Sequence, residues 1–513
     1  MIGAEALVRT LLASGVEACF ANPGTSEMHF VAALDRAPGM RCVLGLAESV
    51  VTGCADGYGR MADKPAATLL HCGPGLANGL ANLHNARRAW TPVVNIVGDQ
   101  ATYHRVHDAP LTTDTEGFAR PVSHWVRTSA TVANVGADAA AAVQAARTAP
   151  GQIATLVLPA DTAWTEGGTP APALPVPART QVAPDTVRAI AATLRRGAPS
   201  MLLLSGTALS EVGLRAAHRI AQVTGARLRT PTQVPRMARG RGRVPVDRIP
   251  YVVDMALEVL SGLKQLVLVA AKPPVGFFAY PGKPSTLWPQ DCALDVLARP
   301  EEDAVAALEA LADELGAPRD VPLPAPKSAE GTPRGAFEPL AFAHIFASLI
   351  PENAIVMEDA VTSGRALFAP TFAAAPNDWM QNTGGAIGIG LPAATGAALA
   401  CPDRKVVCLQ ADGAGMYTLQ ALWTQAREGL DVVTVLFANR VYRILQGELA
   451  AVGAQPGPAA DRLFSLAPPE LDWVRLAGGM GVEATRVETL ESFADVFRAA
   501  NARRGPFLIE FRI

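Results

Sequence analysis

Short apolar runs alternate with segments of helical periodicity along most of the chain. Near the start of the chain these runs are residues 18–21, 42–46, 66–70 and 93–97. Runs this short and this apolar are typical of strands that helices bury on both faces. The pattern predicts a doubly wound parallel sheet. The carboxyl ends of its strands, where open sheets bind ligands, would lie close to Thr25, Glu48, His71 and Asp99.

The same alternation returns near the carboxyl terminus. An apolar run at 406–409 leads into an Asp-Gly-Ala-Gly turn, a helical pattern covers 416–428, and a second apolar run covers 432–437. We predict strand, turn, helix and strand. Asp412 and Asn439 would then lie just past the carboxyl ends of two parallel strands, again at a ligand-binding edge.

Two proline-rich segments divide the chain. Residues 167–184 and 317–335 lack hydrophobic periodicity, which is typical of extended linkers. Between them, apolar runs at 201–204 and 266–269 again predict strands. The expected fold is α/β, with three doubly wound parallel-sheet domains at residues 1–166, 185–316 and 336–513.

Composition excludes several classes of protein. The 513 residues carry a net charge of −3 with dispersed Lys and Arg, which argues against nucleic-acid and membrane-surface partners. Seven cysteines without a CxxC pair indicate thiols of a reducing compartment. The N-terminus carries Glu5 and Arg9 in its helical pattern and lacks a signal-peptide core. We therefore expect a cytoplasmic protein without a membrane span.

Oxygen-bearing side chains mark the edge of the C-terminal sheet. Asp412 offers a carboxylate and Asn439 an amide oxygen, and Gly413 and Ala414 are small enough for backbone N–H groups to approach an anion. A Mg2+ ion is usually held by one or two protein oxygens together with phosphate oxygens and water. The residues indicate a magnesium diphosphate site. The alternative is an ordinary βαβ unit in which Asp412 caps a helix and Asn439 lies in a turn.

Two residues of the N-terminal sheet have side chains suited to proton transfer. Glu48 lies between apolar residues, so we expect it to be buried, and a desolvated carboxyl group can exchange a proton near neutral pH. The alternative is a Glu that the helix dipole stabilises at a helix N-terminus. His71 follows the third strand directly, and a histidine can both donate and accept a proton at pH 7.

A motif near the carboxyl terminus resembles that of enzymes dependent on thiamine diphosphate (ThDP), the decarboxylases and carboligases. It consists of the Asp-Gly turn at Asp412, the 27-residue step to Asn439, and Tyr442. The resemblance extends over nearly the whole chain, although Ala411 and Ala438 replace the Gly and the Asn that are usual there. The metal ligands that it implies are Asp412, Asn439 and the main-chain carbonyl of Val441.

The resemblance also implies how ThDP is held. Glu48 would hydrogen-bond N1′ of the aminopyrimidine and so promote loss of the thiazolium C2 proton, and the cofactor then acts as nucleophile and electron sink. Glu48 and the metal ligands would come from different chains. A homodimer is therefore the expected minimal active unit, and a homotetramer the expected assembly. The other implied cofactor contacts are Val361, Thr362, the Gly385 carbonyl, Ile387, Gly413, Ala414 and Tyr442.

Two segments bear on the subfamily. The turn at 22–25 and the following Leu70-His71 pair resemble benzoylformate decarboxylase, which places Thr25 and His71 among the catalytic residues. The second active-site histidine of that enzyme would fall at 275–281, where this chain has none. The segment instead carries three aromatic residues that wall an apolar pocket or pack between domains, Phe277, Phe278 and Tyr280.

Other signatures point to further subfamilies. His104 and His107 lie in a segment that resembles the histidine-rich loop of pyruvate decarboxylases, which makes His107 a second proton shuttle; a solvated loop is the alternative. The acidic residue that those enzymes carry after the metal motif is Leu445 here, which argues against pyruvate. The turn at 73–75 resembles acetolactate synthases, but Glu448 stands where they carry a Trp.

We expect an enzyme that uses ThDP and Mg2+ to decarboxylate a bulky aryl or branched 2-oxo acid. The reaction would pass through a C2 carbanion and an enamine and release CO2 and an aldehyde. The alternatives are an acetolactate-synthase-like carboligase and, from another class, a non-catalytic nucleotide-binding protein. Residues 388–393 match the GxGxxA dinucleotide fingerprint, but no apolar strand leads into them, which disfavours a nicotinamide dehydrogenase. The turn at 204–207 lacks a glycine fingerprint, so we expect a structural central domain without FAD.

Overall fold

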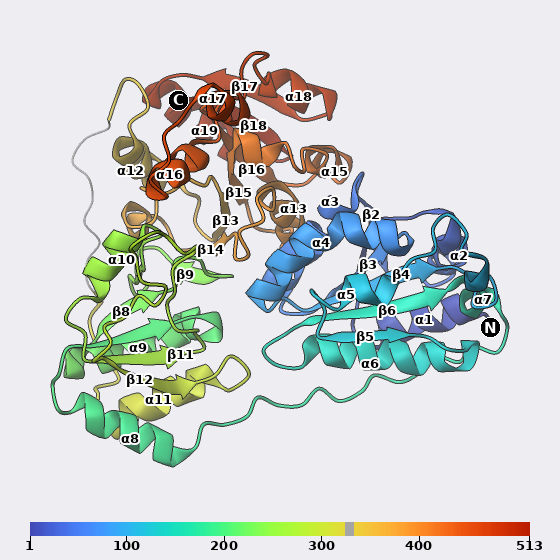
Figure 1. Ribbon diagram of the computed structural model, residues 1–513, viewed down its shortest axis with the longest axis horizontal. Helices are drawn as coiled ribbons and strands as arrows, with labels where there is room; N and C mark the ends of the chain where they lie inside the picture. The colour runs from blue at the N-terminus through green and yellow to red at the C-terminus, as the bar shows by residue number, and fades with distance from the viewer. Residues whose placement is uncertain (324–332) are drawn as a thin grey trace.

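The computed structural model describes residues 1–323 and 333–513. These residues form three β-sheets, each with helices packed on its faces (Figure 1). In Figure 1 the N-terminal sheet lies at the right, the central sheet at the lower left and the C-terminal sheet at the top. The predicted linker at 317–335 falls partly outside the described residues.

The first sheet is parallel, with strand order β2-β1-β3-β4-β6-β5. Its strands are β1 (Ala18–Asn22), β2 (Arg41–Leu44), β3 (Ala66–Leu70), β4 (Val93–Asp99), β5 (Trp125–Thr128) and β6 (Ile153–Pro159). Its helices are α1 (Gly3–Ala13), α2 (Met28–Asp35), α3 (Glu48–Ala62), α4 (Cys72–Ala89), α5 (Thr115–Ala119), α6 (Val135–Arg147) and α7 (Ala160–Trp164).

Alternate residues of this sheet enter two different cores. Leu69 of β3 packs in the core that contains residues of α1 and α6. Its neighbour Leu70 packs in the core that contains residues of α3 and α4. Successive side chains of a strand point to opposite faces, so an unbroken apolar run serves both cores. The predicted doubly wound arrangement is confirmed.

The second sheet is smaller and has the order β10-β8-β7-β11-β12. Its strands are β7 (Ser200–Leu204), β8 (Arg227–Thr230), β10 (Asp247–Arg248), β11 (Gln265–Val269) and β12 (Ala293–Ala298). Its helices are α8 (Pro184–Leu194), α9 (Glu211–Thr224), α10 (Val253–Leu260) and α11 (Ala304–Glu314).

The third sheet has the order β17-β18-β16-β15-β13-β14-β9. Its strands are β9 (Met237–Arg239), β13 (Ala354–Asp359), β14 (Asn377–Gln381), β15 (Val406–Ala411), β16 (Val432–Ala438), β17 (Glu483–Val487) and β18 (Phe507–Arg512). Its helices are α12 (Pro339–Leu349), α13 (Gly390–Ala400), α14 (Asp412–Gly415), α15 (Ala421–Arg427), α16 (Arg443–Ala451), α17 (Pro458–Phe464), α18 (Trp473–Gly479) and α19 (Leu490–Ala502). β9 pairs antiparallel with β14, so a strand from the central part of the chain extends this sheet.

Two sequence predictions about this sheet are wrong. The helix expected at 416–428 is shorter, because only α15 (Ala421–Arg427) forms there, and residues 416–420 are turns in which Thr418 donates its hydroxyl to the carbonyl of Gly388 (2.5 Å). A buried strand, β14, does precede the glycine segment. Its sequence disguises it because its polar side chains are paired: Trp379 Nε1 and Gln381 Nε2 both donate to Glu358 (2.9 Å each).

Helices α3 and α13 bring the first and third sheets together in one chain. A Cβ atom on Gly57 would lie 2.0 Å from the carbonyl oxygen of Ala393, and one on Gly396 would lie 1.9 Å from that of Cys54. Only glycine allows the two helix backbones to approach so closely. None of the described helices is long and apolar enough to cross a membrane.

Candidate active site

Glu48 and His71 lie at the carboxyl edge of the first sheet. Glu48 is the first residue of α3, and three residues separate it from the end of β2. Burial of its side chain was expected, but the residue is only half-buried within one chain, because the first turn of α3 lies at the open edge of the sheet. Asn78 Nδ2 donates to Glu48 Oε2 (3.2 Å). The carboxylate is thus held in place and still accessible.

His71 is fixed by a neighbour that the sequence did not single out. Its Nδ1 lies 2.9 Å from Oε2 of Glu27 and 3.2 Å from the hydroxyl of Ser26. Glu27 is buried, with 4% of its surface exposed. A carboxylate that accepts from Nδ1–H leaves Nε2 as the free nitrogen of the ring. The one available sequence signal was that Glu27 stands three residues after Gly24, whose N–H it caps (2.7 Å).

Two glycines make room for this pair. A Cβ on Gly24 would lie 2.1 Å from Cγ of His71, and a Cβ on Gly98 would lie 1.8 Å from Oε1 of Glu27. The Asn-Pro-Gly turn after β1 and the end of β4 therefore pack directly on the two side chains. Three strands contribute to the placement of one imidazole.

Thr25 and His107 are less closely involved in this arrangement. Thr25 is exposed, and it is the adjacent Ser26 whose hydroxyl reaches His71. His107 is exposed in a short 3-10 turn, with its ring 5.6 Å from that of His104. Nearby, Asp99 is buried, and burial raises the pKa of its carboxyl group despite the N–H of Gln100 and the charge of Arg105.

Asp412 and Asn439 lie together at the carboxyl edge of the third sheet. Asp412 follows β15 and is buried, and Asn439 follows the neighbouring strand β16. Oδ1 of Asp412 accepts from the N–H of Gly413 (2.8 Å), and Oδ2 accepts from the N–H of Arg440 (2.7 Å). Oδ1 of Asn439 accepts from the N–H of Val441 (3.0 Å).

The donor set suits a hard cation. Burial raises the pKa of the Asp412 carboxyl group, although backbone N–H groups oppose the shift. Among the described residues, no cationic side chain is bonded to this carboxylate. A buried carboxylate, an amide oxygen and a nearby main-chain carbonyl are oxygen ligands of the type that Mg2+ takes. The residues present therefore fit the metal. Tyr442 packs against Gly413, where a Cβ would lie 2.4 Å from its ring.

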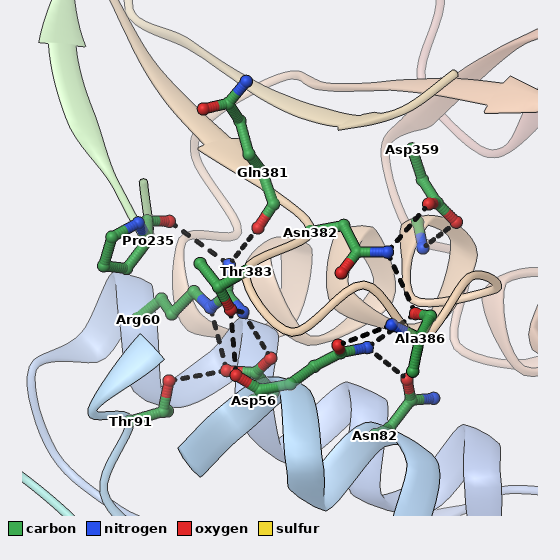
Figure 2. A network of polar contacts seen from close by, with 12 residues as sticks. Asp56, Arg60, Asn82, Thr91, Pro235, Asp359, Gln381, Asn382, Thr383 and Ala386 are labelled. Atoms are coloured by element: carbon green, nitrogen blue, oxygen red, sulfur yellow. Dashed lines mark hydrogen bonds and ion pairs between the residues drawn. The ribbon is translucent and has the colours of Figure 1, made fainter. Parts of the chain in front are cut away.

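The glycine-rich turn between β14 and α13 is held from inside the third sheet by Asp359 (Figure 2). Oδ2 of Asp359 accepts from the N–H groups of Gly388 (2.9 Å) and Gly390 (3.2 Å). Asn382 Oδ1 accepts from the N–H of Gly385 (2.9 Å). Burial raises the pKa of the Asp359 carboxyl group, although these donors oppose the shift. The turn that carries Gly385 and Ile387 is therefore rigid.

The first sheet's helices hold the same turn from the other side. The Asn85 amide bonds both backbone groups of Ala386, donating to its oxygen (2.8 Å) and accepting from its N–H (3.2 Å). Arg60, paired with the buried Asp56 (2.6 Å), donates to the carbonyl of Gln381 (2.6 Å), as Figure 2 shows. No periodicity of the sequence predicted these contacts, which join residues about 300 positions apart.

Val361 stands out in the loop after β13. Its φ angle is +51°, a conformation that is rare for a β-branched residue. Such strain persists only where surrounding structure imposes it, and it is frequent at ligand sites. Val361 and Thr362 were both expected beside the diphosphate. Thr362 also lines a cavity of about 750 Å³ between α16 and the start of α10.

Two doubly wound α/β units, one with a carboxylate at its strand ends and one with oxygen donors that fit a cation, are the arrangement expected of enzymes that bind ThDP between such units. Residues 1–118 match the family model described as thiamine pyrophosphate enzyme, N-terminal TPP binding domain. Residues 364–511 match the corresponding C-terminal TPP binding domain. The chain belongs to the thiamine pyrophosphate enzyme family.

Relatives span the whole chain. It is 52% identical over 512 residues to a Mycobacterium tuberculosis protein provisionally named acetolactate synthase large subunit IlvX, with 99% of this chain and 98% of that protein covered. It is 27% identical to benzoylformate decarboxylase of Pseudomonas aeruginosa, with 97% and 96% covered. The ThDP-dependent 4-hydroxybenzoylformate decarboxylase of Rhodococcus jostii has the same fold, with a TM-score of 0.86 at 24% identity and with 100% and 99% covered.

The protein is thus a ThDP-dependent enzyme of the decarboxylase and acetolactate synthase type. This membership excludes the nicotinamide dehydrogenase and the non-catalytic nucleotide-binding protein that the sequence left open. The eight residues 382–389 between β14 and α13 give the physical reason against the first, because a dinucleotide fingerprint needs a tight turn from strand to helix.

Proposed function

We propose that this enzyme decarboxylates a 2-oxo acid larger than pyruvate, with an aryl or branched substituent, and releases CO2 and an aldehyde. The observation that carries the proposal is the His71–Glu27 pair at the same strand edge as Glu48. Release of an aldehyde requires a proton donor at the reacting carbon, whereas carboligation does not. A histidine oriented by a buried carboxylate can supply that proton. Thr25 and His107 would assist on the exposed side.

The residues of the third sheet would hold the cofactor. Asp412, Asn439 and the carbonyl of Val441 would bind Mg2+ and, through it, the diphosphate. ThDP supplies a nucleophilic carbon and an electron sink for the loss of CO2. The remaining contacts would be Val361, Thr362, Gly385, Ile387, Gly413, Ala414 and Tyr442, with Glu48 exchanging the proton at the aminopyrimidine.

We further propose that the active unit is a homodimer within a homotetramer. Within one chain, the Glu48 carboxylate bonds Asn78 of its own domain, and no described hydrogen bond connects it to the metal-site residues. A second chain would bring a Glu48 to the metal site of the first. The seven cysteines are free thiols, which is consistent with a cytoplasmic location.

A second candidate is carboligation of the acetolactate synthase kind. The name of the 52% identical Mycobacterium relative favours it. Phe277 also favours it. A Cβ atom on Gly385 would lie 2.7 Å from the Phe277 ring, so the ring packs closely on the glycine turn. An apolar wall at this place would keep protons from the reacting carbon.

The test is to supply the purified protein with ThDP and Mg2+ and to measure CO2 and carbonyl products together from pyruvate, branched-chain and aryl 2-oxo acids. We expect aldehyde and CO2 in equal amounts from the larger acids, and loss of turnover in Glu48→Gln. Acyloin or acetolactate as the main product would establish the second candidate. No turnover of any acid would refute both.

A further inference from the structure

The cavity between α16 and the start of α10 opens beside the predicted cofactor loop. It has a volume of about 750 Å³, and Thr362 forms part of its wall. Tyr251 also lines it and packs on Phe277 (5.3 Å between ring centroids), and Phe277 in turn lies against Gly385. The Tyr251 ring of the cavity wall is therefore connected through Phe277 to the glycine turn that is expected to hold the cofactor.

The acidic residues of this cavity are already bonded to other side chains. Glu448 accepts one phenol on each oxygen, from Tyr251 (2.9 Å) and from Tyr280 (2.8 Å). Burial and the bond to Glu448 raise the pKa of both phenols, so both stay protonated and donate. Asp254 is paired with Lys283 (2.6 Å). Asp254 is thus balanced by a cation, whereas Glu448 keeps its negative charge because its two partners are neutral phenols.

Two arginines that line the same cavity have no ionic partner in the described part of the chain. Arg365 and Arg443 line the cavity, and among residues 1–323 and 333–513 neither guanidinium takes part in a recorded ion pair or side-chain hydrogen bond. The Arg365 guanidinium lies over the ring of Tyr251, 5.2 Å from its centroid, which limits its orientation. A planar guanidinium with five N–H donors matches a carboxylate in two-point geometry.

We propose that the 2-oxo acid substrate carries a second anionic group, which Arg365 and Arg443 bind in this cavity. The inference rests on the proposed reaction of a 2-oxo acid and specifies the far end of the substrate. The substituent would extend into the cavity and end in a carboxylate, and the bonds of Glu448 to Tyr251 and Tyr280 hold α16, which carries Arg443, against this cavity. Monocarboxylic 2-oxo acids of equal length lack the second anionic group that the arginines bind.

The experiment compares matched substrates with the ThDP- and Mg2+-loaded enzyme. 2-Oxoglutarate is measured against 2-oxopentanoate, and 2-oxoadipate against 2-oxohexanoate, by kcat/KM. We expect the diacid of each pair to be preferred. Arg365→Gln and Arg443→Gln should each lower kcat/KM for the diacid by roughly 10- to 100-fold. Both variants should leave kcat/KM for the monocarboxylic acid unchanged. Arg462→Gln, on α17 and outside the cavity, is the matched control and should change neither.

A preference for the monocarboxylic acids overturns the inference and leaves the proposed reaction intact. An equal loss of kcat/KM for both acids in the arginine variants does the same. Binding measured without turnover separates the two claims. Glutarate should bind the loaded enzyme at least tenfold more tightly than pentanoate, and Arg443→Gln should abolish the difference. If glutarate binds in this way while no 2-oxo acid turns over, the anion site stands and the proposed reaction is refuted. Equal binding of both acids refutes the site.

Discussion

The carboxyl edges of the first and third sheets are built from different kinds of group. At the first edge, side chains hold one another: Glu27 orients His71, whose side chain is 21% exposed. At the third edge, buried carboxylates hold the backbone: Asp359 accepts from Gly388 and Gly390, and Asp412 from two further N–H groups. The first arrangement suits groups that gain and lose protons. The second suits a fixed grip on a charged cofactor, because rigid backbone needs no reorganisation.

The largest effect should come from the chemistry of the first edge. Glu48→Gln keeps the shape of the side chain and removes its ability to exchange a proton, so we expect kcat/KM to fall by about 10²- to 10⁴-fold. The melting temperature should stay unchanged, because Glu48 is half-buried and its carboxylate, within the described part of the chain, accepts a bond only from Asn78. Steady-state kinetics and thermal unfolding measure the two effects, and Glu352→Gln, an exposed glutamate on another surface, is the control. A large loss of stability would show that Glu48 is structural.

The buried Asp56–Arg60 pair, which helps to join the first sheet to the third, should affect stability more than catalysis. The Asp56–Arg60 pair is fully buried, and removing one partner of such a pair costs about 3–5 kcal/mol of unfolding free energy. Asp56→Asn should therefore lower the denaturant midpoint strongly. The double variant Asp56→Leu with Arg60→Met should recover part of the loss, because it leaves no unpaired charge. Equal stability of the single variant and the wild type would mean that the Asp56–Arg60 pair does not hold the two sheets together.

A smaller effect should follow from moving Glu27 away from His71. An added methyl in Gly98→Ala would collide with Glu27, and displacement of the imidazole by about 1 Å lowers kcat/KM by roughly 10- to 100-fold. Gly478→Ala is the matched control, because a Cβ there meets nothing within 4 Å. If Gly98→Ala forms aldehyde at the wild-type rate, the pair does not position the proton donor.

The smallest effect concerns pH at the third edge. Burial raises the folded-state pKa of Asp412, so ionisation of this group lowers the stability of the metal-free protein as pH rises from about 4 through that pKa. Mg2+ needs the ionised form, so its affinity should weaken by up to about tenfold per pH unit below that pKa. Titration of Mg2+ and ThDP by calorimetry at several pH values measures this. In Asp412→Asn the pH dependence should disappear; its persistence would place the metal elsewhere.

The sequence located the groups that follow a strong local pattern. The observed β3 has the bounds that its apolar run predicted, 66–70, because a strand buried on both faces is nearly continuously apolar, and its single polar residue, Thr68, is bonded to Asn95. The positions of Asp412 and Asn439 beyond adjacent strands follow from the same rule, since the end of an apolar run marks the end of a parallel strand. Family membership was likewise predicted from these motifs.

Only the tertiary structure revealed what holds those groups. β14 contains Asn, Asp and Gln, and its partners come from other strands, so its burial has no local signature. Glu27 reaches His71 across 44 residues, and Asn85 reaches Ala386 across 301. Nothing in the sequence indicates that Arg365 and Arg443 line one cavity in which Glu448 is bonded to two tyrosines and Asp254 to Lys283. Hydrophobic periodicity reports which face of an element is buried, whereas polar partners depend on distances that the fold alone sets.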